Sequence, residues 1–161
     1  MRTSLGTAIL MFVAIISGSS IVLSSQIDAY PEESLQAAAL TMEFERIPVA
    51  LGGTIITVEV ADTEEKSLRG LSGRSSLPRD TGMLFLFPSE DRHSFWMKDM
   101  SFPIDIIWFS SDKTIVGILP NLAPETYPKS FVSSTPDRYV LEVPAGFARE
   151  HNLSIGMSAS W

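Results

Sequence analysis

The chain contains no cysteine among its 161 residues. This absence excludes disulfide bonds, thiolate catalysis and cysteine-ligated zinc. Histidine is almost as scarce, because the only two, His93 and His151, lie far apart and lack the spacing of metal ligands. We therefore expect no metal site, and no sequence pattern indicates a cofactor.

Basic residues are also fewer than acidic residues. Lysine and arginine number 12 against 19 acidic residues, which gives a formal net charge of −7. No run or patch of basic residues occurs, so the composition argues against binding to a nucleic acid or docking on an anionic membrane surface. The hydrophobic fraction of 45% is ordinary for a globular protein and is enough to form a core.

The N-terminal part of the chain predicts export. Residues 5–23 are almost continuously apolar and uncharged, with Arg2 before them and acidic residues after them. Residues 1–25 are therefore interpreted as a cleaved signal peptide or an uncleaved membrane anchor. We favour the anchor, because the run approaches the roughly 20 residues that span a bilayer. Residues 26–40 have the composition of a tether, and the domain would then lie outside the cytoplasm, anchored to the cytoplasmic membrane or secreted.

From residue 41 to residue 161 the pattern is that of a β-rich domain. Gly52 and Gly53 predict a hairpin turn between two strands, and Asp62 is expected to cap a short helix that Gly70 ends. A second short helix is expected at residues 145–152, and further strands at 42–49, 54–61, 83–87, 93–97, 104–109, 114–119, 138–143 and 157–161. We predict an α+β, β-rich fold, with a small antiparallel sheet that is barrel-like or curled, two short helices and a preceding N-terminal hydrophobic helix.

Six motifs in a fixed order connect this domain with a known family. They are Val58-Glu-Val-Ala-Asp62, Arg69-Gly-Leu71, Leu77-Pro with Gly82-Met-Leu-Phe85, Phe95-Trp-Met-Lys98, Pro103-Ile-Asp-Ile106 and Tyr139-Val-Leu-Glu-Val-Pro-Ala-Gly146. From about Thr54 to the C-terminus the chain resembles the domain of unknown function 192 family, also called uncharacterised protein family 0127.

The resemblance implies a compact β-rich domain, often exported and often membrane-tethered, but it implies no activity and no catalytic residues. Two features depart from the family pattern. Relatives commonly carry Gly-Asp after the last helix, whereas Met157 follows Gly156 here, and the cysteines that many relatives have in the long loop are absent from residues 121–128.

Asp105 is the first candidate site residue. Strand alternation places it on the same face as Ile107 and Phe109, and a carboxylate on an apolar face is costly unless it is paired. Lys98 is the expected partner, with Arg69 and Arg74 as alternatives. The pair would either belong to a site at the mouth of the barrel or simply fix the fold.

The other candidates are an aromatic side chain and two glutamates. Trp96 shares a strand face with Lys98 and could stack on a flat ligand, or it could be part of the core. Glu59 and Glu142 lie inside valine-rich strands, where they could face one cleft or each point to solvent.

We therefore predict a binding or accessory domain for a small polar ligand or a cell-envelope partner. Its ligand-binding residues would be Arg69, Arg74, Trp96, Lys98, Asp105 and Glu142. The second hypothesis is an envelope-associated hydrolase that uses Asp105 and Glu142 as paired carboxylates. The third is a structural interaction module without a small-molecule site.

Overall fold

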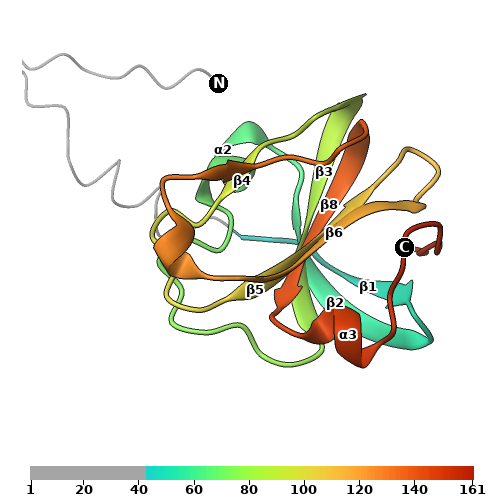
Figure 1. Cartoon of the computed structure of the whole chain (residues 1–161), viewed down its shortest axis with the longest axis horizontal. Helices are drawn as coiled ribbons and strands as arrows, with labels where there is room; N and C mark the ends of the chain where they lie inside the picture. The colour runs from blue at the N-terminus through green and yellow to red at the C-terminus, as the bar shows by residue number, and fades with distance from the viewer. Residues whose placement is uncertain (1–42) are drawn as a thin grey trace, which may run out of the picture.

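A computed structural model describes residues 43–161, whose main element is a curled sheet with short helices beside it (Figure 1). Six strands make this sheet, in the order β1-β2-β3-β8-β5-β6. They are β1 (Arg46–Leu51), β2 (Thr54–Ala61), β3 (Thr81–Asp91), β8 (Asp137–Pro144), β5 (Ile104–Phe109) and β6 (Ile115–Leu122). A separate two-stranded sheet pairs β4 (Phe95–Trp96) with β7 (Ser130–Phe131). The helices are α2 (Glu64–Arg69), α3 (Phe147–Glu150) and the single-turn η1 (Pro124–Thr126).

The six-stranded sheet is mixed, so the expectation of an antiparallel sheet was wrong for one strand pair. β2 and β3 run parallel, while all the other neighbours in this sheet are antiparallel. Two parallel strands cannot be joined by a tight turn, and here the crossover runs through α2 and residues 70–80. The predicted β1–β2 hairpin is confirmed, with Gly52 at φ +61° and Gly53 at φ +81°.

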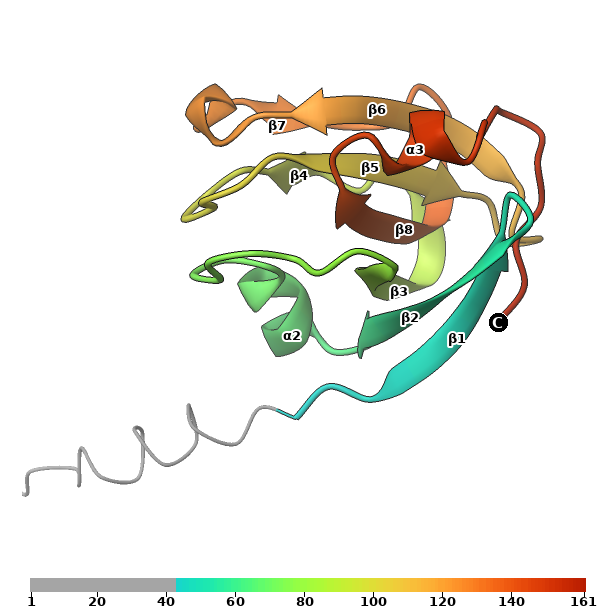
Figure 2. The same ribbon diagram turned by 90° about the horizontal axis from the view of Figure 1, so that it is seen from below.

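The sheet curls but does not close into a barrel (Figure 2). Its edge strands are β1 and β6, which do not pair with each other. At one end the C-terminal segment connects these two edges through isolated bridges, Ala50 with Ser160 and Thr114 with Ser158. The final strand predicted at residues 157–161 is therefore reduced to two bridges.

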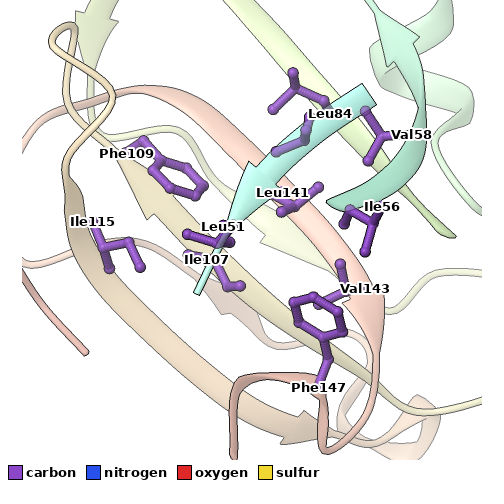
Figure 3. Packing of buried hydrophobic residues seen from close by; sticks show 11 residues of the cluster. Leu51, Ile56, Val58, Leu84, Ile107, Phe109, Ile115, Leu141, Val143 and Phe147 are labelled. Atoms are coloured by element: carbon purple, nitrogen blue, oxygen red, sulfur yellow. The ribbon is translucent and has the colours of Figure 1, made fainter. Parts of the chain in front are cut away.

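Each face of the sheet carries its own hydrophobic core. One core includes Val58, Ile107, Leu141 and Phe147, so α3 covers this face (Figure 3). The core of the other face contains residues from the sheet, from β4 and from the loops beside it: Ala61, Leu71, Met83, Phe85, Phe95, Met97, Ile104, Ile106, Trp108, Leu122 and Val140. Residues at alternating positions of β5 and β8 belong to opposite cores, as the two-residue period of a strand requires.

Several element boundaries differ from those predicted. Thr63, and not Asp62, caps α2, because its hydroxyl accepts the backbone N–H of Lys66. The side chain of Asp62 accepts the Lys66 ammonium group instead. Gly70 ends this helix as predicted. β3 continues to Asp91, beyond the predicted strand at residues 83–87, and the second helix is limited to Phe147–Glu150.

The predicted membrane anchor and tether lie outside the described residues. Within residues 43–161, no helix has the length and hydrophobicity needed to cross a bilayer.

Candidate functional site

A cavity of about 630 Å³ lies between α2, the strand β3 and the segment that includes β4. Ser67, Leu68 and Arg69 contribute from α2, and Glu142 contributes from β8. The remaining wall is rich in aromatic side chains, namely Phe85, Phe87, His93, Phe95 and Trp96. Small-molecule sites in proteins are concave, largely apolar and supplied with a few polar groups, and this cavity has that character.

Glu142 is the buried polar group of the cavity. The strand register places it between Met83 of β3 and Ile106 of β5, on the face of the second core. The residue is only 5% exposed, and burial raises the pKa of its carboxyl to about 8, although the positive charge of Arg74 lowers it somewhat. No hydrogen-bond donor among residues 43–161 reaches this carboxyl. Glu142 therefore faces the cavity, not bulk solvent, and is mostly protonated at neutral pH.

Glu59 lies on the same face but is already paired. The register aligns it with Met83, the neighbour of Glu142, so strand spacing puts the two glutamate Cα atoms about 10 Å apart. Arg46 lies 3.1 Å from one Glu59 oxygen, and Arg74 binds the other. Burial would raise the pKa of Glu59, but both arginines outweigh it and keep this pKa below its usual value. Of these two glutamates, only Glu142 has a carboxyl that forms no ion pair within residues 43–161.

Asp105 lies on the opposite face of the sheet. It pairs with Val143, the neighbour of Glu142, and its side chain is completely buried. Three backbone N–H groups donate to its carboxylate, those of Asn121 at 2.8 Å, Gly146 at 3.0 Å and Ala148 at 2.8 Å.

The expected cation partner of Asp105 was therefore wrong, because three N–H donors already satisfy the carboxylate and hold the start of α3. Within residues 43–161, no arginine or lysine forms an ion pair with it. The structure also does not bring Asp105 and Glu142 together, because the sheet separates their side chains.

Of the other predicted site residues, some border the cavity and some lie outside it. Trp96 is 47% exposed and borders the cavity, so it is not a core residue. Arg69 is exposed and borders both this cavity and a more polar second one, to which Arg74 also contributes. Lys98 is exposed and borders neither of the two. The structure thus brings together Arg69, Trp96 and Glu142.

A histidine–aspartate pair at the cavity was missed from sequence. Nδ1 of His93 lies 2.8 Å from Oδ2 of Asp137, and the His93 ring stacks on Phe87 with centroids 3.6 Å apart. Asp137 is completely buried, and its Oδ1 has no hydrogen-bond partner in the described structure. Burial raises the pKa of Asp137, and His93 counteracts part of this effect. No local signal could reveal the pair, because 44 positions separate its members.

No set of three potential metal ligands comes together within residues 43–161. The chemistry available at the cavity is therefore that of a buried carboxyl, an oriented imidazole and several aromatic side chains. Such a set can hold a ligand with an apolar body and one polar or charged group, and it can transfer protons.

Comparison with known proteins identifies a curated relative of this chain. A UPF0127 protein from Thermococcus gammatolerans is 33% identical over 110 residues, which cover 65% of each chain. The chain thus spans somewhat less than two thirds of the length of this curated relative.

Two solved structures also share the fold. A protein from Sinorhizobium meliloti 1021 that is named as a transcription regulator is 31% identical, with a TM-score of 0.69 over 73% of this chain and 95% of its own. A protein of unknown function from Novosphingobium aromaticivorans is 28% identical, with a TM-score of 0.70 over 75% of this chain and 89% of its own.

The sequence model of the DUF192 family, described as "Uncharacterized ACR, COG1430", matches residues 47–161, which include every residue that borders the cavity. The chain belongs to the DUF192 family.

Proposed function

We propose that this protein is an exported, membrane-tethered domain that binds a small molecule in the cavity at Glu142. The ligand would be an envelope component with an apolar body and one polar group. The apolar residues 5–23 and the positive charge that precedes them support export and tethering. The net negative charge argues against a nucleic-acid partner.

One observation carries this proposal, namely the unpaired Glu142 carboxyl at the cavity. The side chain of Glu142 is buried, yet it borders the cavity, and its carboxyl forms no hydrogen bond with residues 43–161. A purely structural core would place an apolar residue between Met83 and Ile106, because both of these neighbours belong to the hydrophobic core of this face. A costly ionisable group in a concave, mostly apolar site is a mark of function.

The proposal is tested by native mass spectrometry of the purified full-length chain, which detects retained small molecules. The variant Ser67→Trp places a bulky side chain on the α2 wall and is expected to abolish retention. The matched control Glu65→Trp adds the same side chain to the exposed part of α2, outside the cavity, and is expected to retain the ligand. Equal retention by both variants, or no retained molecule in the unmodified chain, would contradict the proposal.

A second candidate function is acid–base catalysis on envelope material, and the His93–Asp137 pair favours it. A carboxylate that holds an imidazole beside a substrate cavity is a recurring catalytic arrangement. In this form the hydrolase hypothesis relies on His93 and Glu142 in place of the predicted pair Asp105 and Glu142. A hydrolase screen in which His93→Gln removes an activity would support it, and an activity that His93→Gln leaves unchanged would argue against it.

A further inference from the structure

We propose that the ligand of this cavity is an organic cation, whose charged head lies against Glu142 and whose apolar body lies against the aromatic wall. This inference rests on the proposed binding function and specifies the ligand class.

The aromatic wall provides the first argument. Phe85 and Phe95 pack edge to face with ring centroids 5.0 Å apart, and Phe87 packs against Phe95 in the same manner at 6.3 Å. All three rings border the cavity, as does the half-exposed Trp96. The faces of such rings carry negative charge density and attract ammonium groups, and this attraction is stronger when the cation is desolvated.

Charge around the cavity gives the second argument. Arg74, which acts electrostatically on Glu142, is bound to Glu59, and Arg69 is exposed at the rim. The acidic residues of the rim are Asp62 and Glu64, of which Asp62 is paired with Lys66 at 2.7 Å. The described structure therefore contains no cation bonded to Glu142. A ligand cation would supply the missing partner, and an ionised carboxylate is stabilised by such a charge.

Binding should then release a proton. Glu142 has a pKa of about 8, so a permanently charged ligand must displace its proton at neutral pH. Affinity is expected to increase about tenfold per pH unit below pH 8 and to level off above it. A neutral ligand that accepts a hydrogen bond from the protonated carboxyl would show the reverse dependence, with weaker binding above pH 8.

The contribution of Glu142 to the pH dependence of binding must be distinguished from the contributions of the other ionisable groups at the cavity. They are Arg69, Asp62, Glu64 and His93, the last of which is bonded to Asp137. The control is therefore Glu65→Gln, which removes an exposed carboxylate of α2 outside the cavity and leaves Glu142 in place.

The test is calorimetric titration of the full-length chain with three matched probes at pH 6, 7, 8 and 9. The probes are 3-phenylpropyl-trimethylammonium, which does not titrate, the neutral 3-phenylpropanol and the anionic 3-phenylpropionate. We expect the cation to bind at least tenfold more tightly than the alcohol at pH 8, and the anion to bind most weakly. Glu142→Gln should remove this preference and the pH dependence, while Glu65→Gln should preserve both.

The outcomes distinguish the inference from the binding function on which it rests. If the alcohol binds as tightly as the cation and Glu142→Gln changes neither affinity, the cavity binds ligands but the cation inference is wrong. The inference is also wrong if the anion binds most tightly, or if all three probes fail while native mass spectrometry finds another molecule retained. If no probe binds and no molecule is retained, both the inference and the proposed function are wrong.

Discussion

The unpaired carboxyl of Glu142 should make the stability of this protein decrease as pH rises from about 5 to 8. The unfolded chain ionises this group at its ordinary value of 4.5, whereas the folded protein holds the proton up to a pKa of about 8. Between these two values the folded state binds one more proton than the unfolded state. The contribution of Glu142 to the free energy of unfolding is therefore greatest below pH 4.5 and falls by about 1.4 kcal/mol per pH unit in this range.

The two pKa values give a loss of about 3 kcal/mol between pH 5 and pH 7.5. Glu142→Gln cannot ionise, so it should lack this part of the pH dependence. The pKa of Asp137 is also raised, so this residue contributes to the pH dependence in the same direction. Because Asp137 is present in both proteins, the difference in pH dependence between the unmodified chain and Glu142→Gln reports Glu142 alone. Glu59 has a lowered pKa, so it acts in the opposite sense and mostly below this range.

The assay is urea unfolding of the full-length chain, followed by tryptophan fluorescence at pH 5 and pH 7.5 in the absence of ligand. Glu65→Gln, on the exposed part of α2, is the control for loss of a carboxylate without burial. We expect the unmodified chain and this control to lose about 3 kcal/mol more than Glu142→Gln does between the two pH values. If all three proteins show the same pH dependence, Glu142 is not a buried, protonated group and the reasoning fails.

Three further changes test other parts of the structure. Asp105→Asn retains only one acceptor oxygen for three N–H donors, so it should lower the free energy of unfolding by about 2 kcal/mol. Ligand affinity on the opposite face should not change, and unchanged stability in urea unfolding would contradict this prediction. Gly82→Ala would bring a Cβ within 2.6 Å of the Glu142 backbone carbonyl oxygen in β8, so it should lower the free energy of unfolding by about 2 kcal/mol in the same assay. An unchanged free energy of unfolding would contradict this prediction and show that β3 can shift. Arg74→Gln removes a positive charge that lowers the pKa of Glu142, so this pKa should rise in a carbon-13 NMR titration of the carboxyl. A decrease in the pKa would refute the electrostatic effect of Arg74 on Glu142.

Local patterns in the sequence were sufficient for much of the fold. Gly52 and Gly53 marked the first hairpin, and the strand Ile104–Phe109 was predicted with its observed bounds. The parallel pairing of β2 with β3 was not predictable, because a crossover through one short helix looks locally like any other connection. Closure into a barrel depends on whether β1 and β6 meet, and no residue of either strand encodes that contact locally.

The site was predictable only in part. Strand alternation correctly put Asp105 on the face of Ile107 and Phe109, but it could not show that backbone N–H groups from residues 121–148 would satisfy it. Glu142 was identified as an unusual charge in a valine-rich strand, whereas its burial depends on the cavity that α2 and β4 enclose. His93 and Asp137 meet only after folding, so their pairing carried no sequence signal.

The most direct test of the central claim is NMR of the full-length chain with carbon-13-labelled methionine methyl groups. Met100 borders the cavity, whereas Met157 packs against the core on the other face and serves as an internal control. Titration with 3-phenylpropyl-trimethylammonium at pH 8 should shift the Met100 signal to saturation, leave Met157 in place, and lose its effect in Glu142→Gln. A Met100 signal that does not move, or that moves equally in Glu142→Gln, would contradict the claim that Glu142 forms a binding site for organic cations.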